Sequence, residues 1–175
     1  MKNLILLFTA IITLSSCKNM VPYTDALRQK YNWSENDLKR IQFYTSDAIV
    51  LQRKIVEGET RIQEGKIKTI NGEKVEEIII RSGTPGILIE ESNGKLSVSF
   101  EKNDQHYINF GKNVNMNNRF SIAFSSLQNK IGTINYNGTK YFTAPETVDA
   151  ILMVDMRRID NSELNQRVAK GRKVK

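Results

Sequence analysis

The sequence predicts a mainly β fold, either a single antiparallel β-sandwich or a small barrel, preceded by one short N-terminal helix. Three Asn-Gly pairs flanked by apolar residues indicate tight hairpins, because both central positions of a type I′ turn need positive φ. Two segments, at residues 96–101 and 120–125, alternate apolar and polar side chains, as strands with one buried face do. About nine or ten such strands with short connections make one β-rich domain.

The predicted helix begins after Ser34, whose hydroxyl can cap the first turn, with Asp37 three residues later as in a capping box. Leu38, Ile41 and Tyr44 then recur at helical spacing and would share one face. The pattern therefore predicts a helix that ends at about Tyr44, before Val and Ile become frequent.

The strands are predicted from the turn signals. Each Asn-Gly pair separates the arms of a hairpin, which are residues 62–70 with 73–81, 87–91 with 95–101, and 131–136 with 139–143. The run Ile78-Ile79-Ile80 is apolar on both faces and suggests a central strand, and residues 148–156 suggest another. Gly65 interrupts the alternation and suggests a bulge.

The N-terminus has the pattern of an export signal. Lys2 precedes an apolar run that ends in Leu14-Ser15-Ser16-Cys17. This run is too short to cross a bilayer, which needs about 20 apolar residues. Its last four residues resemble the lipobox of bacterial lipoproteins. The resemblance implies that residues 1–16 are a signal peptide removed before Cys17, and that Cys17 carries a covalent diacylglycerol and an acylated amine.

Acylation would also account for an otherwise unpaired thiol, because Cys17 is the only cysteine in the chain. Several acyl chains anchor a protein stably, whereas one alone is marginal. In the lipoproteins that this chain resembles, an Asp directly after the cysteine often retains the protein in the inner membrane, and here that residue is Lys18. The resemblance therefore implies an outer-membrane lipoprotein that faces the periplasm, with no cofactor besides the lipid on Cys17.

The sequence suggests four parts. We expect a signal peptide at residues 1–16, a lipidated tether at 17–24, a β-rich domain with its N-terminal helix at 25–160, and a basic tail at 161–175. The tail is either a solvated end or a contact for lipid phosphates. Its candidate partner-binding residues are Arg167, Lys170, Arg172 and Lys173.

The mature chain has a modest positive charge. Without Lys2 it has 25 basic and 19 acidic side chains, a net charge of +6. This balance favours membrane lipid headgroups or an acidic envelope protein as partner rather than nucleic acid, unless it serves solubility alone.

Few side chains suit catalysis. His106 is the only histidine, and Glu101 and Asp104 lie nearest to it; a solvated hairpin end is favoured there over an ion site. No Gly-x-Ser-x-Gly elbow or glycine-rich phosphate loop is present. Glu76 and Glu77 are neighbours in one predicted strand and would point to opposite faces. The sequence therefore predicts a protein that is not an enzyme and holds no metal.

Trp33, the only tryptophan, directly precedes the predicted N-cap and is expected to pack as a hydrophobic staple. It is also a candidate partner-binding residue, because aromatic side chains carry much of the binding energy of interfaces. Four other aromatic residues are expected in the sheet core rather than around a ligand: Tyr107, Phe110, Phe120 and Phe124.

These observations predict a non-catalytic, membrane-anchored lipoprotein that acts as a binding or accessory subunit of an envelope complex for secretion, transport or assembly. One alternative is a carrier of a lipid or small apolar ligand, with a barrel cavity lined by Phe110, Phe120, Ile122 and Phe124. Another is a periplasmic inhibitor or immunity-type protein that binds an enzyme through an exposed loop at residues 111–118.

Overall fold

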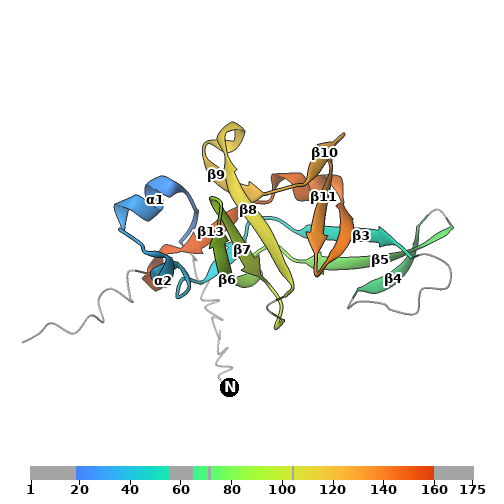
Figure 1. Ribbon diagram of the computed structural model, residues 1–175, viewed down its shortest axis with the longest axis horizontal. Helices are drawn as coiled ribbons and strands as arrows, with labels where there is room; N and C mark the ends of the chain where they lie inside the picture. The colour runs from blue at the N-terminus through green and yellow to red at the C-terminus, as the bar shows by residue number, and fades with distance from the viewer. Residues whose placement is uncertain (1–18, 56–64, 71, 104, 160–175) are drawn as a thin grey trace, which may run out of the picture.

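The computed structural model describes residues 19–55, 65–70, 72–103 and 105–159. Their strands form two antiparallel sheets, one of seven and one of six strands, so the predicted mainly β, antiparallel fold is confirmed. Neither sheet closes into a barrel within these residues, so the small barrel considered from the sequence is wrong. Figure 1 shows the short helices at one end of the long axis and part of the six-stranded sheet at the other.

The seven-stranded sheet combines strands from both ends of the chain. Single bridges from Thr24 to Arg119 and from Ser121 to Ile151 bring its last strand back beside its first two, so the sheet is curved and its edges approach each other. Its order is β1 (Met20–Pro22), β13 (Leu152–Asp155), β2 (Phe43–Thr45), β6 (Pro85–Ser92), β7 (Lys95–Ser99), β8 (Tyr107–Asn113) and β9 (Arg119–Ile122).

The six-stranded sheet has the order β10 (Ser126–Gln128), β11 (Ile131–Tyr136), β12 (Thr139–Thr143), β3 (Ile49–Lys54), β5 (Glu73–Ile80) and β4 (Lys66–Ile70). The three predicted hairpins are present as β4–β5, β6–β7 and β11–β12, although residues 62–64 of the first arm lie outside the described residues. A fourth tight hairpin, β10–β11, turns at Asn129 and Lys130 with φ of 50° and 64°. No Asn-Gly pair marks it in the sequence.

Two segments of the chain pass from one sheet into the other, each as two consecutive strands. β2 leads directly into β3, and β5 leads into β6, so that both pairs bend at the same place. At this corner Gly83 N–H donates to Thr45 O at 2.8 Å, and Ser46 exchanges two hydrogen bonds of 3.0 and 2.9 Å with Ile151. Strands that switch sheets at such corners fix how the two sheets pack.

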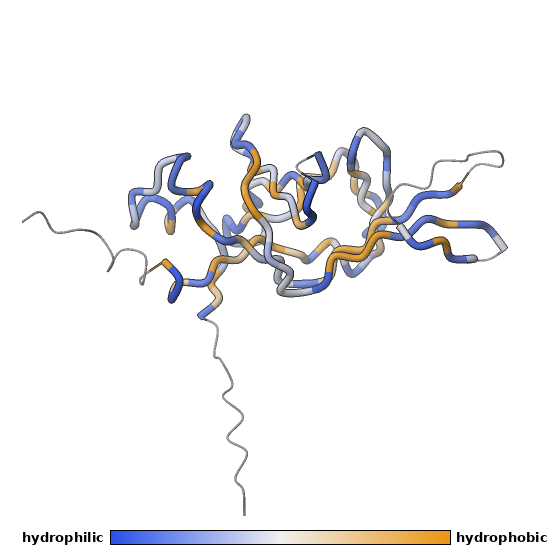
Figure 2. Tube along the Cα trace, turned by 90° about the horizontal axis from the view of Figure 1, so that it is seen from below, coloured by the Kyte–Doolittle hydropathy of each residue, from blue (hydrophilic) through white to orange (hydrophobic). Residues whose placement is uncertain are grey.

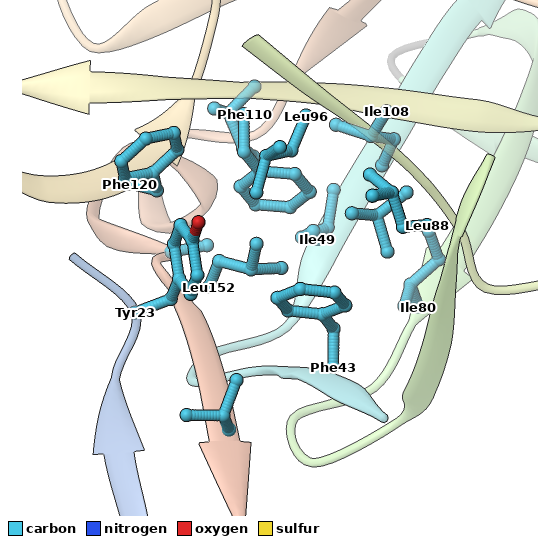
Figure 3. Packing of buried hydrophobic residues seen from close by; sticks show 14 of the residues in the cluster. Tyr23, Phe43, Ile49, Ile80, Leu88, Leu96, Ile108, Phe110, Phe120 and Leu152 are labelled. Atoms are coloured by element: carbon cyan, nitrogen blue, oxygen red, sulfur yellow. The ribbon is translucent and has the colours of Figure 1, made fainter. Parts of the chain in front are cut away.

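One hydrophobic cluster connects the sheets. Figure 3 shows Ile49 and Ile80 of the six-stranded sheet converging with Phe43 and Leu88 of the seven-stranded sheet. Figure 2 shows hydrophobic residues along strands in the middle of the molecule and hydrophilic residues at the helices and hairpin ends. The described residues therefore share one core across both sheets.

The predicted tether is corrected in its described part. β1 pairs with β13 along Met20–Pro22, and Asn19 O accepts a hydrogen bond from Met156 N–H at 3.0 Å. Pairing with the buried strand β13 outweighs the absence of strand periodicity in this short segment. The residues from Asn19 to Pro22 therefore belong to the folded domain.

The helical region is also corrected. The sequence predicts one helix in this region, and the described residues from 25 to 38 form two short ones, α1 (Asp25–Lys30) and α2 (Glu35–Leu38). The predicted capping box is confirmed, with Ser34 N–H donating to the Asp37 carboxylate at 2.9 Å. The second helix ends at Leu38 rather than near Tyr44, because residues 43–45 are buried in β2. Sheet pairing has overridden the helical spacing.

Three serines predicted to face water are buried instead: Ser97, Ser99 and Ser121. Ser97 Oγ donates to Asn109 Oδ1 at 2.7 Å, and Asn113 Nδ2 donates to Ser121 Oγ at 3.0 Å. Ser99 is hydrogen-bonded to main-chain carbonyl groups. A small hydroxyl is buried at little cost once it is hydrogen-bonded, so the period-two pattern does not reveal a second covered face.

The described residues also form two 3-10 helices, η1 (Val114–Met116) and η2 (Pro145–Asp149). Because Pro145 begins η2, the strand predicted at residues 148–156 is confined to β13. The central strand predicted at residues 78–80 is confirmed as part of β5, which lies between β3 and β4.

Gly86→Ala in β6 is expected to destabilise the fold, because the new Cβ would lie 2.7 Å from the Phe100 ring and 2.8 Å from Val98. Overpacking of this kind costs about 1–3 kcal/mol. Gly111→Ala in β8 is the matched control, since its nearest atoms would lie 3.7 and 3.8 Å away. Urea denaturation should show a reduced free energy of unfolding for Gly86→Ala only, and equal losses in both variants would contradict this packing.

Candidate functional site

An apolar patch lies on the outer face of the six-stranded sheet. Val50 of β3 pairs with Ile79 of β5, and Phe142 of β12 faces β3 two residues from Val50. Phe142 also pairs with a residue of β11, and Ile131 lies two residues from that residue in the same strand. Cross-strand partners and residues two apart share a face, so these four side chains lie on one side of the sheet. We call Val50, Ile79, Ile131 and Phe142 the outer patch.

The outer patch is open to solvent. Ile79, Ile131 and Phe142 are 51%, 46% and 46% exposed. Large apolar side chains that are exposed together mark surfaces that bind other molecules. The sequence places Ile79 in a strand covered on both faces, but the Ile79 side chain itself is open to solvent.

Lysines dominate the charge around the outer patch. Lys140 Nζ lies 5.3 Å from the centroid of the Phe142 ring. Lys68 pairs with Glu77 and holds the pKa of that carboxyl below its usual range. The strands carry four lysines and two glutamates on this face, a local net charge of +2: Lys54, Lys66, Lys68 and Lys140 against Glu73 and Glu77.

The inner face of the same sheet contains a buried charge. The Glu76 carboxylate accepts hydrogen bonds from Arg53 Nε at 2.6 Å, Gly65 N–H at 3.0 Å and the Tyr141 hydroxyl at 3.3 Å. A side chain on Gly65 would collide with Glu76, so this glycine makes room for the carboxylate. Glu76 and Glu77 face opposite ways, as the sequence predicts, and both are buried and paired with cations.

A second polar cluster surrounds His106, which is buried rather than solvated as the sequence suggested. Its Nδ1 lies 2.7 Å from Glu101 Oε2, and the Tyr136 hydroxyl donates to the same oxygen at 2.8 Å. The cluster links residues that follow β7 to β11 and so ties the two sheets together. Asp104 lies outside the described residues. Within the described ranges, no three His, Cys, Asp or Glu side chains gather as a metal site would require.

Tyr23 has the only buried side-chain oxygen or nitrogen among the described residues that lacks a hydrogen-bond partner. Burial raises the pKa of its hydroxyl to about 12, although the nearby Arg28 acts in the opposite direction. Arg28 lies close enough to Tyr23 to act on that pKa and forms its ion pair with Glu91 at 2.5 Å. A buried hydroxyl without a partner costs about 1–3 kcal/mol of stability.

A cavity of about 630 Å³ lies where the helices meet the end of β13. Tyr31 and Trp33 line it and stack with ring centroids 5.2 Å apart and planes at 17°. Arg40, Asp155 and Arg158 also line it. We call this the helix-side cavity.

Trp33 is 8% exposed and lies in the core cluster with Leu38, the packing that the sequence suggests for a staple. Its role in partner binding stays a prediction. The expected core position of Tyr107 is wrong because its side chain is exposed, while Phe110 and Phe120 are buried as expected and Phe124 is partly buried against the core.

Five candidate residues lie outside the described residues: Cys17, Arg167, Lys170, Arg172 and Lys173. The sequence did not indicate the outer patch or the helix-side cavity, because each is assembled from segments far apart in the chain. No local spacing connects Arg40 with Arg158 or Ile79 with Phe142.

Comparison with protein-family models, with curated proteins and with solved structures finds no match to this chain. Across the part of the chain that the structure describes, no helix has the length and apolar character needed to cross a bilayer. The function is therefore inferred from the surfaces described above.

Tyr23→Phe is expected to leave the free energy of unfolding unchanged or raise it by about 1 kcal/mol, because it removes a buried hydroxyl that has no partner. Tyr141→Phe is the matched comparison, since this equally buried hydroxyl bonds to Glu76. That variant should lose about 1–3 kcal/mol. Thermal and urea unfolding of both variants measure the difference, and a loss of stability in Tyr23→Phe would show that its hydroxyl has a partner.

Proposed function

We propose that this chain is a non-catalytic lipoprotein, anchored through lipid on Cys17 at the periplasmic face of the outer membrane, that acts as a binding or accessory subunit of an envelope complex. The two sheets serve as a sandwich-like scaffold for a docking surface. The outer patch is the observation that carries this proposal, because three large apolar side chains are about half exposed there.

The charges beside the outer patch favour an envelope protein with an apolar surface and acidic residues around it. The strands of this face have a net charge of +2, and Lys66 and Lys140 form no ion pair with any described residue. Complementary charges at the rim of an interface mainly speed association and select the partner. The apolar centre of the patch supplies the contact area.

The position of the outer patch suits a protein held at a surface. In Figure 1 the helices and the end of β13 lie at one end of the molecule, and β3 and β5 extend toward the other. Asn19, the first described residue, is hydrogen-bonded to the residue that follows β13, at the same end of the molecule as the helices. An anchor at Cys17 therefore leaves the six-stranded sheet directed away from the membrane and open to a partner.

The packing of the seven-stranded sheet favours a binding subunit over a carrier. Phe110, Phe120 and Ile122, which would line a carrier's cavity, are almost completely buried in the core cluster. The inhibitor hypothesis remains a second candidate because Val114, at the tip of the β8–β9 hairpin, is 73% exposed. An exposed apolar residue on a projecting loop is the kind of contact that an inhibitor inserts into an enzyme.

Cys17→Ser is expected to abolish incorporation of labelled palmitate and lipid-dependent attachment to the outer membrane, because serine offers no thiol for the diacylglycerol. The measurement is metabolic labelling in a bacterium that processes lipoproteins, followed by membrane fractionation. The wild-type chain is the control. If the wild-type chain takes up no palmitate, the proposed anchor is wrong.

Ile79→Thr combined with Phe142→Thr is expected to remove the partner, because these changes keep β-branched or strand-compatible residues but delete the exposed apolar area. The acylated protein is purified from gently solubilised outer membranes, and bound proteins are quantified by mass spectrometry. A stoichiometric partner of the wild-type chain should decrease by at least about tenfold, as truncation of two central interface residues at about 1 kcal/mol each predicts.

The matched control replaces two exposed residues of the other sheet, Ile87→Thr with Tyr107→Thr, which have similar exposure. This control should retain the partner. Equal loss in both double variants, or full retention in the Ile79 and Phe142 variant, would reject the outer patch as the docking surface.

A further inference from the structure

The helix-side cavity lies beside the point where the chain enters the fold. Asp155, which lines the cavity, is the β13 partner of Met20, and Met156 N–H donates to Asn19 O at 3.0 Å. Three residues of extended chain span at most about 11 Å, so Cys17 lies within that distance of Met20. The headgroup layer on each side of a bilayer is roughly 5–8 Å thick. A lipid on Cys17 therefore brings the cavity to the headgroup layer.

Two cations of the cavity are open to an anion. Arg40 and Arg158 are exposed, and neither lies within ion-pair distance of a described carboxylate, although the charge of Arg40 helps to lower the pKa of Asp37. The two carboxylates of the cavity are already engaged. Asp37 accepts hydrogen bonds from the N-cap residue of α2, which lower its pKa. Asp155 accepts a hydrogen bond from the main-chain N–H of Arg157 at 3.2 Å and pairs with the Arg157 side chain at 3.8 Å.

These arginines suit a phosphate group. A guanidinium presents parallel N–H donors that match two phosphate oxygens, which makes arginine a better partner for phosphate than a point charge of equal size. Because Arg40 follows α2 and Arg158 follows β13, a phosphate between them would be held from two independent segments of the fold.

The aromatic wall of the cavity distinguishes a lipid from a free ion. Tyr31 and Trp33 present stacked rings beside the arginines. Tyrosine and tryptophan favour the interface between membrane and water, where one part of the ring meets apolar groups and the other stays hydrated. Such rings can pack against the glycerol and first methylene groups of a lipid, which inorganic phosphate lacks.

We propose that the helix-side cavity binds the phosphate of an anionic phospholipid in the bilayer that holds the protein. The inference rests on the proposed anchor at Cys17 and adds an orientation to it. An acyl anchor alone leaves the domain free to rotate about the tether. A headgroup held by Arg40 and Arg158 fixes the helix end against the bilayer and keeps the outer patch directed outward.

The test uses the mature acylated protein in phosphatidylcholine nanodiscs, with Trp33 fluorescence as the readout. Trp33 is the only tryptophan and lines the cavity, so its emission reports on this site alone. Short-chain phosphatidylglycerol, short-chain phosphatidylcholine and inorganic phosphate are added in separate titrations. Phosphatidylglycerol is expected to change the emission saturably, phosphatidylcholine to leave it unchanged, and inorganic phosphate to act only at much higher concentration.

Arg40→Gln with Arg158→Gln should raise the half-saturating concentration of phosphatidylglycerol about 25-fold, since each basic residue near an anionic surface contributes about fivefold. Lys54→Gln with Lys140→Gln removes the same charge from the other end of the molecule. This control should change the half-saturating concentration of phosphatidylglycerol less than twofold. Thermal melting checks that both double variants remain folded. An unchanged titration in the arginine variant, or an equal shift in the lysine control, would overturn the proposal.

Two further outcomes would also overturn it. Equal responses to phosphatidylglycerol and phosphatidylcholine would remove the role of the anionic phosphate. Saturation by inorganic phosphate at the same concentration as by phosphatidylglycerol would assign the cavity to a free anion. Palmitate labelling tests the anchor separately, so a negative titration in an acylated protein rejects this site and leaves the proposed function intact.

Discussion

The corner at which β2 continues into β3 and β5 continues into β6 is the constraint on which the rest of the structure depends. Because two paired strands bend together, the register of one sheet determines that of the other. Ile151 is hydrogen-bonded to Ser46 at this corner, which places β13, and β13 in turn holds β1. The corner therefore positions the chain entry beside the helices and also sets which residues of β3 and β5 face outward.

Two buried polar clusters add specificity to this arrangement. Glu76 is bound from β3, from β12 and from the segment before β4, and Glu101 is bound by His106 and Tyr136. Removing one partner of a buried ion pair costs about 3–5 kcal/mol, although replacing the whole pair with apolar groups is often neutral. The clusters therefore penalise a shifted register strongly even though they add little net stability.

The sequence predicts three of the strand pairings, the hairpins β4–β5, β6–β7 and β11–β12, and little of either surface. Asn-Gly turns locate three hairpins because their positive φ is a local requirement, and the Ser34–Asp37 capping box is equally local. The end of α2 and the strand β1 depend on pairing with distant strands, which no local pattern encodes. The sequence does not predict the outer patch or the helix-side cavity for the same reason. Cys17 stays a prediction from the signal sequence alone.

The outer patch and the helix-side cavity both combine cations with apolar side chains, so either one taken alone resembles a surface for anionic lipid. Covalent geometry separates them. Met20 is paired with Asp155 at the helix end, and at most about 11 Å of chain connects Met20 to Cys17. Figure 1 shows β3 and β5 extending away from that end. Under the proposed anchor, a bilayer that holds Cys17 would meet the helix end of the molecule first and would leave the outer patch open to the proposed partner.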